Sequence, residues 1–151
     1  MVLDTFLSDP RFSLLSIPTV WALNLAPALL KNATIGMSIG WDNVNPRGNI
    51  GRIRDAGLAA RVDRMDGAHK NAMELFPLWI AAVLAATITK VDTHTVNTAA
   101  IAFITLRALY TLVYITQKTN AQGFLRTAVW LAACTVPLHL LFQAANVAAH
   151  H

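Results

Sequence analysis

One stretch of this sequence, from Ala68 to Ala86, reads AHKNAMELFPLWIAAVLAA. Most of its residues are apolar, and about 20 such residues cross the hydrocarbon core of a bilayer as a helix. Asn71 and Glu74 lie in its first turns, three positions apart and therefore on one helical face. An ionised side chain inside a membrane is costly unless it faces a partner or a wet cavity. The stretch therefore predicts a membrane helix whose Glu74 belongs either to a functional site or to a buried structural pair.

The composition of the whole chain is that of a membrane protein. Of its 151 residues, 55% are hydrophobic and only 13% are charged, whereas about a quarter of residues are charged in soluble proteins. The mean hydropathy is +0.46, and the length suits one domain covering residues 1–151. Four apolar segments predict an all-α integral membrane protein, folded as a four-transmembrane-helix bundle. The expected spans are about 12–30, 68–89, 95–116 and 125–147.

The basic residues predict the orientation of this bundle. The first connection, expected over about residues 31–67, and the third connection, each counted with its flanking residues, carry most of them: Lys31, Arg47, Arg52, Arg54, Arg61, Arg64, Lys70, Lys118 and Arg126. The opposite side has only Arg11 and Lys90, so the positive-inside rule places the first and third connections in the cytoplasm. This clustering beside apolar segments favours a membrane protein over a nucleic-acid-binding one. We expect the endoplasmic reticulum membrane in a eukaryote and the inner membrane in a bacterium.

Polar side chains from all four expected helices converge near the cytoplasmic side of the membrane. At about 1.5 Å per helical residue, Glu74 lies roughly 9 Å and Arg107 roughly 13 Å from that side. The full set at this depth is Lys31, Lys70, Asn71, Glu74, Arg107, Tyr110, Tyr114 and Arg126. Several cations with one carboxylate, one amide and two phenols suit an anionic, polar and partly peptide-like ligand.

Simpler interpretations of the same residues stay open at this point. In one, Glu74 and Arg107 form a buried ion pair that joins two helices. In another, the lysines and Arg126 are ordinary anchors at the membrane surface. A small proton-coupled exporter also has four helices and one membrane glutamate, but the long first connection and the buried Arg107 fit that class poorly.

Three motifs in order and register carry a resemblance that covers essentially the whole chain. They are Arg64-x-x-x-Ala68-His69-Lys70-Asn71-x-x-Glu74-x-x-Pro77, Arg107-x-x-Tyr110-Thr111-x-x-Tyr114 and Arg126-Thr127-x-x-Trp130. Together they resemble the MAPEG family, the membrane-associated proteins in eicosanoid and glutathione metabolism. The cluster Asp42-Asn43-x-Asn45-Pro46-Arg47 resembles a loop of a microbial branch of that family.

The resemblance implies a homotrimer of four-helix subunits that binds glutathione between subunits near the cytoplasmic face. The residues that it assigns to glutathione binding, together with those that the depth argument adds, are Lys31, Lys70, Asn71, Glu74, Arg107, Tyr114 and Trp130. Four positions depart from well-known relatives. Gly67 and Lys70 stand where arginines are found, Tyr110 stands in place of a histidine, and Trp130 stands in place of a tyrosine.

The activity implied is that of a glutathione-dependent membrane transferase or peroxidase, acting on lipophilic electrophiles or lipid hydroperoxides from the bilayer. Arg126 matches the arginine that stabilises the glutathione thiolate, which is the reactive form of the thiol. Tyr110 and Thr127 are the candidates to donate a hydrogen bond to the sulfur. The alternative is a non-catalytic scaffold of the same family that binds lipid or glutathione.

Overall fold

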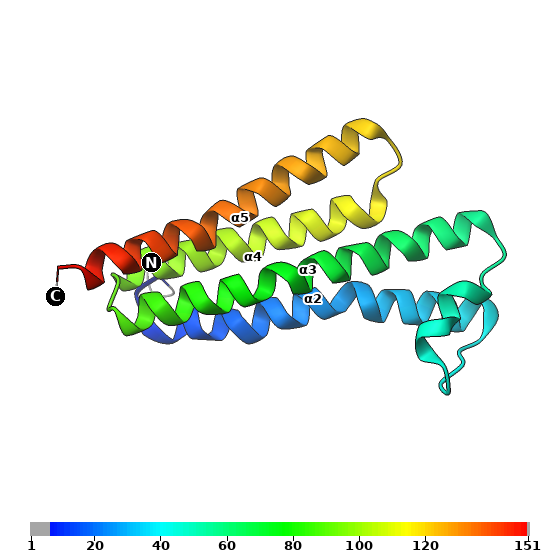
Figure 1. The fold of residues 1–151 in the computed structure, drawn as a ribbon, viewed down its shortest axis with the longest axis horizontal. Coiled ribbons are helices and arrows are strands. Elements are labelled where there is room, and N and C mark those ends of the chain that lie inside the picture. The colour runs from blue at the N-terminus through cyan, green and yellow to red at the C-terminus, as the bar shows by residue number, and fades with distance from the viewer. Residues whose placement is uncertain (1–6, 151) are drawn as a thin grey trace.

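The computed structural model describes residues 7–150, and every long element in that range is a helix. Four helices lie side by side in an up-and-down arrangement (Figure 1). A short 3₁₀ helix follows the first of them. The elements are α2 (Pro10–Ile39), η1 (Pro46–Arg52), α3 (Ala56–Ile88), α4 (Thr93–Thr116) and α5 (Asn120–Ala148). The predicted all-helical class is confirmed. All four long helices are also long and apolar enough to cross a membrane.

Each long helix begins at a side chain that caps its free backbone N–H groups. Asp9, Asp55 and Asp92 accept hydrogen bonds from the first turns of α2, α3 and α4. Thr119 and Gln122 form a reciprocal capping box at the start of α5. Such caps contribute about 0.5–2 kcal/mol each, and here they fix where the chain turns back between helices.

The first connection is shorter than the expected 31–67, because both flanking helices continue beyond the predicted spans. Nothing between Lys31 and Ile39 breaks a helix, and α2 ends only at Gly40, whose φ of 75° lies in the left-handed region. On the other side, α3 already begins at Ala56. Lys31 therefore lies inside a helix and not at its end.

Buried Asn49 orders the remaining connection between α2 and α3. Its amide nitrogen donates to the carbonyl oxygens of Asp42 at 2.8 Å and Pro46 at 3.1 Å. Its side-chain oxygen accepts from the backbone of Asp42 at 3.0 Å and from Arg52 at 2.7 Å. The turn-rich cluster is therefore a folded loop built around one amide.

The core is built on two stacked aromatic rings and on small residues that let the helices approach closely. The rings of Trp79 on α3 and Phe103 on α4 lie 4.3 Å apart and nearly parallel. The indole N–H of Trp79 donates to Ser16 on α2 at 3.2 Å. Alanines such as Ala82 and Ala133 are fully buried around them, as is typical of helix contacts in membranes. Toward the η1 end, α5 diverges from α3 (Figure 1).

Candidate functional site

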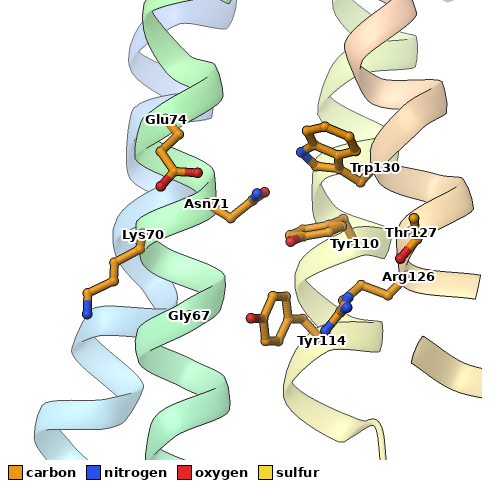
Figure 2. A pocket seen from close by; sticks show the side chains of 9 residues that line it. All are labelled: Gly67, Lys70, Asn71, Glu74, Tyr110, Tyr114, Arg126, Thr127 and Trp130. Atoms are coloured by element: carbon orange, nitrogen blue, oxygen red, sulfur yellow. The ribbon is translucent and has the colours of Figure 1, made fainter. Parts of the chain in front are cut away.

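A cavity of about 330 Å³ lies between α3 and the α4–α5 pair (Figure 2). It is lined by Gly67, Lys70, Asn71, Glu74, Tyr110, Tyr114, Arg126, Thr127 and Trp130. All of these except Gly67 are among the predicted site residues. The structure thus brings residues of three helices, far apart in the sequence, around one volume.

The residues that α3 contributes differ in where they point. Asn71 extends toward α4 and α5, whereas the ammonium group of Lys70 points away from them (Figure 2). That ammonium pairs with Asp66, one helical turn earlier, at 2.7 Å. Glu74 is exposed in the single chain. Asn71 is therefore the α3 side chain that reaches furthest into the cavity.

Aromatic rings and cations alternate along the opposite wall. The rings of Tyr110 and Tyr114 meet edge to face with their centroids 5.6 Å apart. The guanidinium of Arg126 lies 4.7 Å from the centre of the Tyr114 ring, a distance at which a cation and an aromatic face attract. The Thr127 hydroxyl donates to its own helix, at the carbonyl of Gly123. Arg126 is therefore the cation that the fold holds at this cavity.

Arg107 lies behind the cavity wall and not on it. It is 1% exposed, its guanidinium lies 4.5 Å from the centre of the Tyr110 ring, and it donates to the side-chain oxygen of Asn71 at 3.4 Å. Its Nη2 has no hydrogen-bond partner in the described part of the chain. Within residues 7–150 no ion pair joins Arg107 to Glu74. The structure gives no support to the interpretation of these two residues as a helix-locking pair.

Lys31 is the predicted site residue that the structure places elsewhere. Its ammonium pairs with Asp66 at 2.7 Å, and its side chain is only 17% exposed. It lines a separate cavity between α2, α3 and the η1 loop, together with residues such as His69 and Arg47. The depth argument places Lys31 at the same membrane edge as Arg126, whereas in the structure Asp66 is its partner. The spacing of Asp66 four residues before Lys70 was the signal for this competing carboxylate.

The residues around the cavity are chemically suited to an anionic ligand. The half-buried guanidinium of Arg126, held against an aromatic ring, provides a positive charge at a defined place, partly removed from bulk water, where electrostatic attraction is stronger than in water. The Asn71 amide offers both a donor and an acceptor for a peptide group. Fold and site thus define a multi-pass membrane bundle with a cationic, amide-bearing cavity near one end.

The comparison with known families agrees with this description. The model of the MAPEG family matches residues 14–146, nearly the whole chain. The protein belongs to the MAPEG family and is an integral multi-pass membrane protein, with a general role in glutathione or eicosanoid metabolism. Neither the curated proteins nor the solved structures contain a significant match to this chain.

Proposed function

We propose that this protein is a glutathione-dependent membrane transferase or peroxidase that acts on lipophilic electrophiles or lipid hydroperoxides. The observation that carries the proposal is the position of Arg126, held against the Tyr114 ring at 4.7 Å in a cavity that Asn71 and Glu74 also line. The cavity volume of about 330 Å³ falls at the small end of ligand pockets, which range over about 300–1,000 Å³.

The wall residues match the groups of a glutathione molecule. Asn71 pairs with a peptide group, Glu74 with the ammonium, and Lys70 with a carboxylate once it leaves Asp66. Within residues 7–150 the Nη2 of buried Arg107, next to Asn71, has no hydrogen-bond partner, which supports a ligand or water at this point. Trp130 on α5 adds an apolar surface to the wall.

Arg126 then sets the reactivity of the sulfur. A neighbouring cation favours the thiolate over the thiol and so raises the nucleophile population at neutral pH. Tyr110 donates a hydrogen bond to the sulfur, or Thr127 does so after its hydroxyl leaves the carbonyl of Gly123. In the transferase reaction the sulfur forms a bond to the electrophilic carbon, and the leaving group departs with the bonding electron pair. In the peroxidase reaction two glutathione molecules reduce one hydroperoxide, giving an alcohol, water and glutathione disulfide.

The proposal includes a homotrimer with the first and third connections in the cytoplasm. Glu74 and Thr127 are exposed in the single chain although both lie on apolar helices. A carboxylate that faced lipid would be costly, so a neighbouring subunit or the ligand covers this side. The basic residues of those two connections support the orientation through the positive-inside rule.

The test is a titration of detergent-purified protein with glutathione, followed by the ultraviolet absorbance of the thiolate as a function of pH. We expect the wild type to form thiolate below the ordinary pKa of a cysteine thiol, about 8.5. Arg126→Ala should raise the midpoint by about one to three pH units, because the opposite charge is lost. The absence of any thiolate signal in the wild type would refute the proposed mechanism.

One observation favours the second candidate, a non-catalytic scaffold that binds lipid or glutathione. Two of the predicted cations, Lys31 and Lys70, are both paired with Asp66, and each would have to leave this carboxylate before it could bind a ligand. Turnover of a generic electrophile separates the candidates, because only the enzyme consumes glutathione. Binding of glutathione without turnover would select the scaffold.

A further inference from the structure

Gly67 on α3 is in closer contact with Tyr114 than any side chain at that position would allow. A Cβ built on Gly67 would lie 2.5 Å from the Tyr114 hydroxyl oxygen and 3.0 Å from the ring carbon that bears it. Real Cβ atoms essentially never come within 3.0 Å of another heavy atom. In Figure 2 the phenol reaches from α4 across to α3 at the level of Gly67. The present position of Tyr114 therefore requires glycine.

Among the described glycines of the four long helices, only Gly67 has this property. A Cβ at Gly36 or Gly57 would come no closer than 3.8 Å and 3.4 Å to its nearest neighbour, and a Cβ at Gly123 would meet nothing within 4 Å. Glycine within a helix costs about 0.5–1 kcal/mol relative to alanine. At Gly67 the chain bears this cost at the position where the Tyr114 side chain contacts α3 across the cavity.

The contact leads on to Arg126. The Tyr114 ring has its hydroxyl end against α3 at Gly67, while its face lies 4.7 Å from the Arg126 guanidinium on α5. The same ring makes an edge-to-face contact with Tyr110. A shift of Tyr114 away from α3 would therefore move the surface on which the guanidinium rests.

We infer that Gly67 is a positioning residue, whose missing side chain seats Tyr114 so that its ring holds Arg126 at the cavity. The chemical meaning of that position rests on the proposed function, in which Arg126 stabilises the thiolate. The inference also gives a reason for glycine at this position. In this chain an arginine at 67 and Tyr114 in its present position exclude each other.

The experiment compares Gly67→Ala with Gly123→Ala, a helical glycine in open space on α5. Both substitutions raise helix propensity by the same amount, so a difference between them reports the Tyr114 contact. We expect Gly67→Ala to raise the midpoint of the glutathione thiolate titration by about one pH unit, which lowers the ratio of thiolate to thiol at a given pH about tenfold. Gly123→Ala should leave the midpoint unchanged. Equal midpoints for both variants would overturn the inference.

A double-mutant cycle with Tyr114→Ala tests whether Gly67→Ala changes the titration midpoint through Tyr114. Tyr114→Ala alone should raise the midpoint, and adding Gly67→Ala to it should change nothing further, because the clash has gone. Contacting residues show such non-additivity, whereas independent ones add. Additive shifts would show that Gly67 does not act through Tyr114. If Gly67→Ala alone fails to fold, recovery of folded protein by adding Tyr114→Ala is the expected result, and continued misfolding contradicts it.

The same cycle separates this inference from the proposed function. Thermal unfolding in detergent without glutathione should show that Gly67→Ala lowers the Tm of the wild-type protein. The same substitution should not lower the Tm of the Tyr114→Ala variant. A wild type without thiolate signal but with this coupling would refute the proposed chemistry and leave the seating of Tyr114 intact. A thiolate signal without the coupling would refute only the role of Gly67.

Discussion

The two halves of the bundle are packed by different kinds of side chain. In the half near the α3–α4 link, Trp79 stacks on Phe103 among buried alanines, and apolar residues of all four long helices form one cluster. In the half near η1, cations lie against tyrosine rings and a cavity separates α3 from α4 and α5. Close packing in the first half holds the helices together, so the helices of the second half can lie further apart and leave room for the cavity. The comparison shows that the apolar core and the polar cavity lie at different places along the bundle axis.

The largest expected effect is the loss of the packed half. Trp79→Ala should lower the free energy of unfolding by about 3–5 kcal/mol, because it removes a fully buried ring from a stacked pair. Thermal and denaturant unfolding in detergent measure the change, with Phe142→Ala as the control at a ring that is 70% exposed. An equal loss for both variants would mean that this stack does not anchor the bundle.

In the cavity half, Asn71→Ala should weaken glutathione binding up to about tenfold. The substitution removes the amide that reaches across the cavity and accepts from Arg107, and a hydrogen bond contributes about 0.5–1.5 kcal/mol. Isothermal calorimetry measures the affinity. Met73→Ala, nearby on α3 but outside the cavity lining, is the matched control. Unchanged affinity in Asn71→Ala would remove this residue from the binding site.

A smaller effect of the opposite sign is expected at Asp66. This carboxylate holds Lys31 and Lys70 at 2.7 Å each. Asp66→Asn should free Lys70 for a ligand carboxylate and tighten glutathione binding about threefold, the size of a partly exposed ion pair. Asp63→Asn removes an exposed charge from the same helix and is the control. Weaker binding in Asp66→Asn would show that the paired lysines already serve the site as they stand.

The smallest effect is a pH dependence at the α4 start. The backbone N–H of Thr95, and then its hydroxyl, donate to Asp92 and hold the pKa of that carboxyl below its ordinary value. A carboxyl whose pKa is lowered by folding stabilises the protein above its unfolded pKa of about 3.9, and the contribution is lost as the pH falls through the folded pKa. Asp92→Asn should therefore reduce the acid dependence of Tm below about pH 4. If Asp92→Asn left the fall of Tm below about pH 4 unchanged, the proposed contribution of Asp92 would be wrong.

The sequence predicts those features of each half of the bundle that depend on residues close together in the chain, and it misses those that depend on contacts between helices. The lengths of the apolar segments are enough to predict the four helices. Because the rise per helical residue is regular, the calculated depth of each residue also places Asn71, Tyr114 and Arg126 at one level of the membrane. The same counting misplaces Lys31, since it does not register that α2 continues to Ile39 or that Asp66 competes for the ammonium. From the sequence, the one notable feature of Gly67 is that it stands where well-known relatives have an arginine. Its contact with Tyr114 depends on the distance between two helices, which no local pattern encodes.

The buried amide of Asn49 has a consequence for proteolysis. Surface connections are where proteases usually cut, because cleavage needs backbone that opens locally. In this connection, however, the backbone carbonyls of Asp42 and Pro46 are held by the Asn49 side chain, which in turn accepts from Arg52. A protease must break this network before it gains an extended substrate. The longest link between helices is thus protected by one side chain, and Asn49→Ala would turn it into a cleavage site while leaving the apolar helices uncut.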